Sequence, residues 1–393
     1  MPTTTSPVSA RQKAAVLAVL CASVFVVVLD GTIVNVALPT LVRQLGASTS
    51  DLQWIVDSYV LVFAGLLMAA GSLGDRLGRK GVMQIGLALF ALFSGLAAFS
   101  GSPGELIGWR AAMGVGAALM FPATLAILVN VFTAPRERAT AIAVWAATSG
   151  LAVALGPVTG GWLLEHYWWG SVLVINVPVV AVALIAVARV VPTSRDETIR
   201  RFDPLGTVLS IAAIGVLVWA VIEGPVHGWA STTSLLAFAA AALALVTFVW
   251  WERRREHPML DVSVFANMRF TAGSVAVTFA FFALFGFVFV VTQYFQFVRG
   301  YGALEAGIRT VPFAVFAAST APIAAALAER IGTKVVVTGG LVAMSVGFAV
   351  AALTADVDTP YLVIVVAMFF MASGLGLVQA PATEAIMGSL PPH

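Results

Sequence analysis

The sequence predicts an all-α polytopic membrane protein, and three observations support this fold class. Hydrophobic residues fill 60% of the 393 positions, and the mean hydropathy is +0.99. A water-soluble fold cannot cover that much apolar surface. Charged residues make up only 10% of the chain. The apolar residues also fall into twelve segments that each reach roughly the 17–25 residues needed to cross a bilayer as a helix.

Helix is the only conformation that fits these segments, because backbone polar groups in lipid must be paired within the segment. Arg11 and Lys13 precede the first apolar run, as in a signal peptide, but the run continues to Pro39, so we expect an uncleaved first helix. The twelve segments are about 14–38, 54–73, 82–99, 105–131, 139–164, 170–191, 205–223, 231–251, 269–297, 305–328, 335–354 and 361–387.

The basic residues set the expected orientation. Of the 21 lysines and arginines, 17 lie in the N-terminus and the loops of one side, 3 lie in the opposite loops, and Arg110 lies inside a segment. Cytoplasmic loops carry the excess of positive charge. We therefore expect a multi-pass protein of the cell inner (cytoplasmic) membrane with a cytoplasmic N-terminus.

Several function classes are excluded by what the sequence lacks. The longest polar stretch, Pro192–Pro204, is too short for a soluble catalytic domain, and no phosphate-binding G-x-x-x-x-G-K-[ST] motif occurs. The four histidines do not cluster with acids at ligand spacing, and Cys21 is the single cysteine. We expect no enzyme, no cofactor and no metal site, but transport driven by an ion gradient. The expected partners are a small-molecule substrate, protons and membrane lipids, without nucleic acid, and the expected state is a monomer.

A short charged motif occurs twice and indicates an internal repeat, as in many transporters. Gly71–Lys80 returns as Ala325–Lys334, with an offset of 254 residues (329 minus 75). We expect a tight cytoplasmic loop at each copy. One interpretation is a turn whose charges only set topology; the interpretation we favour is a gate, because Asp75 can pair with a base or cap a helix in one state only. The candidate gate residues are Gly71, Asp75, Arg76, Gly78, Arg79, Lys80, Glu329 and Arg330.

Charged residues inside the apolar segments are the candidates for coupling, because a buried charge costs about 2.5–3.5 kcal/mol on insertion scales. Asp30, Asp57 and Arg110 are expected in the bundle formed by the first six segments. All three fall in the half of that bundle nearer the outer face of the membrane. An arginine there can hold a carboxylate ionised until a proton or cation competes. The alternatives are an ion pair kept for packing and, for Asp57, a side chain that reaches the interface.

The fifth segment carries small residues and a proline at helical spacing. Gly156 and Gly160 let a neighbouring helix approach closely, and Pro157 bends the helix. The pattern leaves plain packing and a hinge for alternating access equally open. The candidate residues of this segment are Gly150, Gly156, Pro157, Gly160 and Gly161.

Together these motifs resemble the major facilitator superfamily, and within it the fourteen-helix drug:proton antiporters of the EmrB/QacA kind. The resemblance implies proton-coupled export, with Asp30 and Arg110 in proton coupling, Asp57 in recognition of cationic substrates and Asp75 in gating. It also identifies Gly156–Gly161 as the antiporter motif. The matching stretches are Leu29–Pro39, Trp54–Tyr59, Gly71–Lys80, Arg110 with Gly114 and Gly116, and Gly156–Gly161.

The resemblance implies a domain organisation as well. We expect an N-terminal six-helix bundle over 1–195, a linker with two inserted helices over 196–262, and a C-terminal bundle of four helices over 263–393. The sixth segment ends near Val191, and the repeat offset is 254 residues for the charged motif and 259 for a second match, Pro122 with Pro381. The counterpart of the sixth segment should then end near 445–450, so we expect twelve of fourteen helices in this sequence. A twelve-helix protein is the alternative, although it fits the repeat less well.

The expected function is a proton-coupled exporter of hydrophobic compounds, with cationic compounds as a candidate class. The alternatives are a dedicated exporter of one metabolite, antibiotic or lipid and, ranked lower, a non-transporting membrane sensor. A sensor would not need the three intramembrane charges. The sequence leaves the exported compound and the choice between H⁺ and Na⁺ open.

Overall fold

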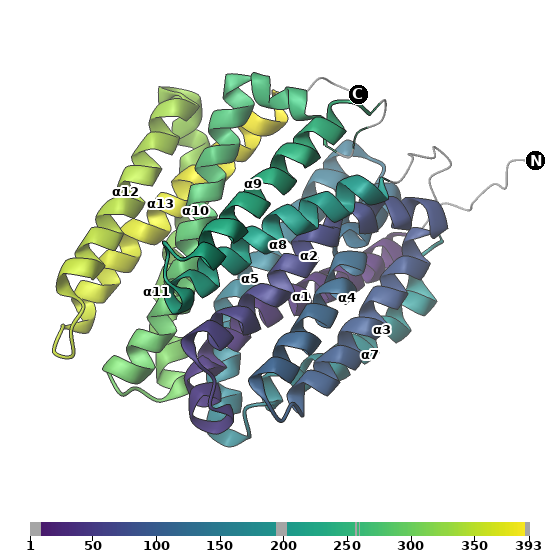
Figure 1. Ribbon diagram of the computed structural model, residues 1–393. Helices are drawn as coiled ribbons and strands as arrows, with labels where there is room; N and C mark the ends of the chain where they lie inside the picture. The colour runs from purple at the N-terminus through teal and green to yellow at the C-terminus, as the bar shows by residue number, and fades with distance from the viewer. Residues whose placement is uncertain (1–8, 194–202, 256–257, 259, 390–393) are drawn as a thin grey trace, which may run out of the picture. The chain divides into compact units, whose positions relative to one another are not determined.

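The computed structural model describes residues 9–193, 203–255, 258 and 260–389, and these ranges are helical without any β-strand (Figure 1). Twelve spans are long and apolar enough to cross a membrane, which confirms the predicted fold class. The α-helices are α1 (Ala10–Leu45), α2 (Thr49–Leu77), α3 (Arg79–Ala98), α4 (Pro103–Val131), α5 (Pro135–His166), α6 (Ser171–Val174), α7 (Asn176–Val190), α8 (Pro204–His227), α9 (Thr232–Glu252), α10 (Met268–Gln293), α11 (Ala303–Ile331), α12 (Thr333–Thr354) and α13 (Tyr361–Met387).

Two spans depart from a single regular helix. The sixth span consists of α6 and α7, which meet at Ile175. The helix α10 continues into a π-helical turn, η2 (Tyr294–Val298), and is preceded by a 3₁₀ turn, η1 (Val262–Ala266). Long apolar side chains remain exposed along the spans, such as Leu353 at 85% and Phe282 at 78%. Such faces are stable only against lipid.

Local capping signals place the helix starts. The side chain of Ser48 accepts a hydrogen bond from the Asp51 amide (3.2 Å), and the Asp51 carboxylate accepts one from the Ser48 amide (2.8 Å). This capping box satisfies amides that the first turn of α2 leaves free. Proline follows the capping residue at the starts of α4 and α8, where its missing N–H costs nothing.

The described helices belong to two compact units. Unit 1 comprises Met1–Val34, Thr40–Ala152 and Tyr167–Leu260, and unit 2 comprises Asn35–Pro39, Val153–His166 and Asp261–His393. The chain of α1 and of α5 therefore contributes residues to both units. The expected boundaries near 195 and 263 stay a prediction.

Within unit 1, α4 packs against α2 and α3, and the inserted α8–α9 hairpin packs against α2 through α8. Glycines make this packing close. A Cβ added to Gly114 would lie 2.7 Å from the Tyr59 carbonyl oxygen, and one added to Gly116 would lie 2.7 Å from the Phe90 nitrogen. The backbones of α2, α3 and α4 thus approach one another where α4 has no side chain.

The structure corrects the expected ten-residue loop at Gly71–Lys80. The helix α2 continues to Leu77 and α3 begins at Arg79, so a single residue, Gly78, separates them. Gly78 adopts φ +107°, and Gly332 adopts φ +89° at the same place in the second copy, between α11 and α12. Glycine is needed because other residues are strained at such angles. The two copies therefore share one local structure.

Within unit 2, α13 packs against α10, α11 and α12. A short piece of α1 also belongs to this unit, and its proline explains how. Pro39 has no N–H, so the carbonyl of Asn35 loses its helical donor. The hydroxyl of Thr292 on α10 donates to that carbonyl at 3.1 Å. The side-chain amide of Gln296 donates from Nε2 to the Val36 carbonyl at 2.9 Å. The carbonyls that precede Pro39 thus accept hydrogen bonds from α10 and η2 within unit 2.

Candidate functional site

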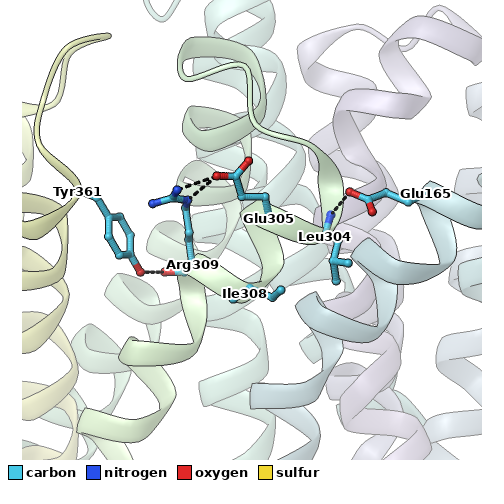
Figure 2. Close-up of a pocket in the computed structure, with 6 residues that line it drawn as sticks. All are labelled: Glu165, Leu304, Glu305, Ile308, Arg309 and Tyr361. Carbon is cyan, nitrogen blue, oxygen red and sulfur yellow. Dashed lines mark hydrogen bonds and ion pairs between the residues drawn. The ribbon is translucent and has the colours of Figure 1, made fainter.

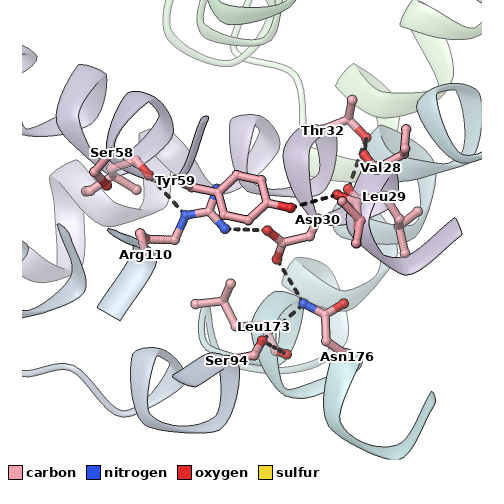
Figure 3. A network of polar contacts seen from close by, with 12 residues as sticks. Val28, Leu29, Asp30, Thr32, Ser58, Tyr59, Ser94, Arg110, Leu173 and Asn176 are labelled. Carbon is pink, nitrogen blue, oxygen red and sulfur yellow. Dashed lines mark hydrogen bonds and ion pairs between the residues drawn. The ribbon is translucent and has the colours of Figure 1, made fainter. Parts of the chain in front are cut away.

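A buried ion pair lies at the centre of the polar network in unit 1 (Figure 3). Arg110 of α4 donates from Nη1 to Oδ2 of Asp30 on α1. Both residues have no exposed surface. A charge removed from water is tolerated only when it is paired, so each residue makes the position of the other possible. The structure brings these two predicted coupling residues together.

Two residues of α2, Ile55 and Tyr59, orient the Arg110 side chain. Its Nε donates to the carbonyl of Ile55 at 3.0 Å, and its guanidinium lies 4.4 Å from the centre of the Tyr59 ring. The Tyr59 hydroxyl in turn donates to the carbonyl of Val27 on α1 at 3.2 Å. Arg110 is therefore held on three sides by α1 and α2. Tyr59 belongs to the second-helix motif, but nothing in the sequence assigned it this position.

Two residues that the sequence analysis did not single out complete the network. Asn176, at the start of α7, donates from Nδ2 to Oδ1 of Asp30 at 2.8 Å and lies 3.1 Å from the Ser94 hydroxyl oxygen of α3. The Ser94 hydroxyl donates to the Leu173 carbonyl at 2.8 Å. The available signal was one amide in a segment that is otherwise apolar. Its partner is 146 residues away in sequence, so sequence alone could not identify it.

The network leaves two polar atoms without a partner in the described chain. They are Nη2 of Arg110 and Oδ1 of Asn176, and both are buried. An unpaired buried group carries a penalty of about 1–3 kcal/mol. Nη2 of Arg110 can thus donate one more hydrogen bond, and Oδ1 of Asn176 can accept one more.

Asp57 does not join this network. Its side chain on α2 is half-buried and makes no hydrogen bond or ion pair with any described residue. Its neighbours on α2 are engaged elsewhere: the Trp54 indole donates to Glu223 of α8 at 3.1 Å, and the Ser58 hydroxyl donates to the Ile107 carbonyl at 3.2 Å. The Asp57 carboxylate is therefore not part of the Asp30–Arg110 network.

Residues of the cytoplasmic motif connect four helices of unit 1, namely α2, α3, α4 and α7. Asp75 accepts from Nε of Arg79 at 2.8 Å, and the same arginine donates to the Ala126 carbonyl of α4 at 3.4 Å. Lys80 donates to the Ala188 carbonyl near the end of α7 at 2.8 Å. Asp75 thus pairs with a base of its own motif, one of the two partners expected. Arg76, Glu329 and Arg330 are exposed and make no ion pair among the described residues.

The small residues of α5 divide between the two units. Gly150 faces open space, whereas Gly156, Pro157, Gly160 and Gly161 are buried in the part of α5 that belongs to unit 2. A Cβ added to Gly161 would lie 2.5 Å from the Ala303 carbonyl oxygen of α11. The motif therefore serves close helix packing in this structure, and the hinge interpretation stays a prediction.

One acidic residue outside the membrane spans has a shifted pKa. Burial raises the pKa of Asp203, the capping residue of α8, but hydrogen-bond donors and the charge of Arg255 together lower it by more, so the net shift of the pKa is downward. These donors are the Gly206 amide (3.0 Å), the Trp251 indole (2.9 Å) and the Arg255 guanidinium (3.5 Å). The carboxylate thus stabilises the inner end of the α8–α9 hairpin. Among the residues described, no group of three histidine, cysteine or acidic side chains could hold a metal ion.

The chain is similar in sequence to several bacterial proteins named for multidrug efflux, drug resistance or export. It is 37% identical to the multidrug efflux pump LfrA of Mycolicibacterium smegmatis, over 95% of this chain and 74% of LfrA. It is 36% identical to the methyl viologen resistance protein SmvA of Salmonella typhimurium, over 84% of this chain and 66% of SmvA. It is 34% identical to the tetracenomycin C resistance and export protein of Streptomyces glaucescens, over 95% of this chain and 70% of that protein.

Solved transporter structures share the fold. A bacterial homologue of the human lysosomal transporter Spinster superposes with a TM-score of 0.65 at 16% identity, covering 97% of this chain and 78% of that one. The xylose transporter XylE from E. coli gives a TM-score of 0.62 at 13% identity, covering 95% and 87%. The model of the Major Facilitator Superfamily matches residues 20–393. The chain therefore belongs to the Major Facilitator Superfamily and is a multi-pass protein of the cytoplasmic membrane.

Proposed function

We propose that this protein is a proton-coupled exporter of hydrophobic compounds and that Asp30 carries the proton. The observation that supports the proposal most strongly is the fully buried pair of Asp30 and Arg110, with Asn176 on the other carboxylate oxygen. Arg110 favours the ionised carboxylate, so a proton must compete with the guanidinium. The resistance and efflux names of the relatives support export as the direction.

In the proposed cycle, a proton that reaches Asp30 neutralises the carboxylate and releases Nη1 of Arg110. The guanidinium keeps its hydrogen bond from Nε to the Ile55 carbonyl and its contact with the Tyr59 ring. It therefore changes one partner without moving away from α2. Loss of the proton restores the pair. Two states that differ in one internal ion pair give the bistable element that alternating access requires.

Asp57 is our candidate for recognition of cationic substrates. It is half-buried, lies on α2 three residues after Trp54, and has no partner among the described residues. A substrate cation would supply that partner. Asp75 with Arg79 is our candidate for the cytoplasmic gate, because this pair links the ends of α2 and α3 to α4. We also propose that the protein is a monomer in contact with membrane lipids and binds no nucleic acid.

We place the protein in the fourteen-helix EmrB/QacA-like subclass as a proposal. The α8–α9 hairpin between the two copies of the repeated motif supports this placement. A six-plus-six arrangement has no place for such a hairpin, whereas that subclass carries two inserted helices at this point.

Efflux from energised cells tests the proposed function. Cells without other efflux pumps are loaded with ethidium or methyl viologen, and efflux is followed with and without a protonophore. We expect export that stops when the proton gradient is removed. Export that continues without the gradient, or that requires Na⁺, would contradict proton coupling.

A second candidate is dedicated export of one compound. The relative named for resistance to and export of tetracenomycin C favours it, as does the similarity to a methylenomycin A resistance protein (32% identical). A panel of dyes and antibiotics separates the two functions. Export of several unrelated cations supports the broad exporter, and export of one compound alone supports the dedicated one.

A further inference from the structure

The inserted α8–α9 hairpin carries an acidic residue in a membrane span that the proposed cycle does not use. Glu223 lies on α8 four residues before the helix ends at His227, and only 18% of its side chain is exposed. By the distribution of basic residues, this end of α8 and the start of α2 face the outside. Oε1 of Glu223 accepts a hydrogen bond from the Trp54 indole of α2 at 3.1 Å. An acid inside a membrane span is a candidate for function.

The helices α2 and α8 pack antiparallel along one seam of unit 1. A Cβ on Gly215 would lie 3.7 Å from Cδ2 of Leu61, and one on Gly65 would lie 2.7 Å from Cγ1 of Ile211. From the outer end inward, the contacts are therefore Trp54 with Glu223, Leu61 with Gly215, and Gly65 with Ile211. Asp57 lies one turn after Trp54 and one turn before Leu61, so it lies on the side of α2 that borders α8.

The two acids of this seam have no lysine or arginine to balance them among the described residues. Asp57 forms no ion pair with any described base. The basic group near Glu223 is His227, whose Nδ1 lies 3.8 Å from Oε2 of Glu223 and closer, at 3.2 Å, to the Glu223 backbone carbonyl oxygen. The His227 side chain is 42% exposed. The seam therefore has acidic groups for which a cationic ligand would supply the charge partner.

An aromatic residue accompanies each acid. Trp54 precedes Asp57 by one turn of α2, and Trp219 precedes Glu223 by one turn of α8. The ring centre of Trp219 lies 5.9 Å from that of His227. The face of an aromatic ring attracts organic cations, and tryptophan does so most strongly. Two acids with two indoles on one seam thus suit a flat organic cation that carries more than one charge.

The open pocket of unit 2 offers different chemistry (Figure 2). Its lining residues are Glu165, Leu304, Glu305, Ile308, Arg309 and Tyr361. Glu305 pairs with Arg309 at 2.6 Å, and Glu165 accepts from the Leu304 amide at 3.2 Å. A cation in this pocket would meet the guanidinium of Arg309. The α2–α8 seam therefore fits a multiply charged cation better than this pocket does.

We propose that Glu223 is a specificity-determining residue of the cation-recognition site at Asp57, and that the two acids together favour organic dications over monocations. The inference rests on the proposed recognition of cationic substrates by Asp57. One acid can neutralise a single charge, and the second charge of a dication gains from the second acid. For charges a few ångströms apart near a protein surface, this gain is about tenfold in affinity. The inserted hairpin thus takes part in substrate selection.

Binding of two matched cations to the purified protein tests this inference. Methyl viologen has two linked aromatic rings and two positive charges, whereas 1-methyl-4-phenylpyridinium has nearly the same shape and one charge. The dissociation constant of each cation is measured by equilibrium dialysis in detergent solution, at one pH and one ionic strength. The ratio of the two constants reports the preference of the protein for the second charge.

Glu223→Gln keeps the size of the side chain and an oxygen that can accept from the Trp54 indole. We expect this variant to weaken methyl viologen binding by about tenfold and phenylpyridinium binding by no more than about twofold. Asp57→Asn should weaken the binding of both cations. Glu223→Asp keeps the charge, should retain the preference for the dication, and serves if Glu223→Gln does not fold. Glu305→Gln is the matched control, an acid of the unit 2 pocket, and should leave the ratio unchanged.

Equal weakening of both cations by Glu223→Gln, or unchanged binding of methyl viologen, would overturn the inference, as would a parent protein that binds neither cation. A ratio that changes in Glu305→Gln and not in Glu223→Gln would place the dication in the unit 2 pocket and overturn it as well. The measurement uses no gradient, so none of these results bears on proton-driven export of other hydrophobic compounds. Conversely, a parent that prefers the dication but exports no dye would contradict the exporter and not the role of Glu223.

Discussion

Asp30→Asn removes one buried charge and keeps the shape of the side chain. The substituted amide oxygen can still accept from Nη1 of Arg110. Its NH₂ group would face Nδ2 of Asn176, but Oδ1 of Asn176 has no described partner and can accept after half a turn of that amide. The substitution therefore changes charge in a preserved geometry.

The expected magnitude follows from the burial of both partners. Removing one partner of a buried ion pair costs about 3–5 kcal/mol. Because the hydrogen bonds can be retained, we expect the lower end, about 3 kcal/mol, which corresponds to about a 100-fold change in an equilibrium. The variant should insert and fold with stability reduced by about that amount, and its proton-driven efflux should fall to the background rate, because a carboxamide cannot take up and release a proton.

The assay is dye efflux from proteoliposomes under an imposed pH gradient. Ser94→Ala is the matched control, because it removes the hydroxyl beside Asn176 and no charge, and should reduce efflux by no more than about fivefold. Gradient-dependent efflux by Asp30→Asn at the parental rate would refute the assignment of the proton to Asp30.

Three further predictions concern packing, backbone geometry and pH. Gly307→Ala should destabilise the protein by about 1–3 kcal/mol in thermal unfolding, because the added methyl group meets the Pro157 carbonyl; an unchanged midpoint would contradict the close contact. Gly78→Ala, at φ +107°, should lower export and stability, whereas Gly74→Ala, inside α2 with open space around it, should do neither; equal effects would refute the backbone argument. The lowered pKa of Asp203 gives stability that is present above about pH 4 and is lost as the pH falls further, so Asp203→Asn should flatten acid unfolding below about pH 4; a parental acid profile would contradict it.

Much of the fold could be predicted from the sequence, because membrane helices are specified by apolar length alone. The twelve predicted segments correspond to the twelve spans of the structure. The ends of the helices were less predictable. The motif at Gly71–Lys80 has the composition of a loop, yet Asp75 and Arg76 continue α2, because one glycine at positive φ suffices to reverse the chain.

The candidate site was predicted in part, for a physical reason. An isolated charge in an apolar segment must find a partner, so Asp30, Asp57 and Arg110 could be singled out from the sequence. The structure shows which of the two acids pairs with the arginine, namely Asp30. Neutral polar residues give no such signal, because a lone amide or hydroxyl is tolerated within a membrane helix. Asn176 and Ser94 therefore became visible only when the packing of α3 and α7 brought them to Asp30.

Substrate-dependent proton movement in everted vesicles tests the central claim most directly. Respiration acidifies the vesicle interior, and a pH-sensitive dye reports that acidity. With the parent protein, ethidium or methyl viologen should raise the internal pH as protons leave in exchange for the entering cation, and Asp30→Asn should abolish this response. Uptake of the cation by the parent without any proton movement would contradict proton-coupled export.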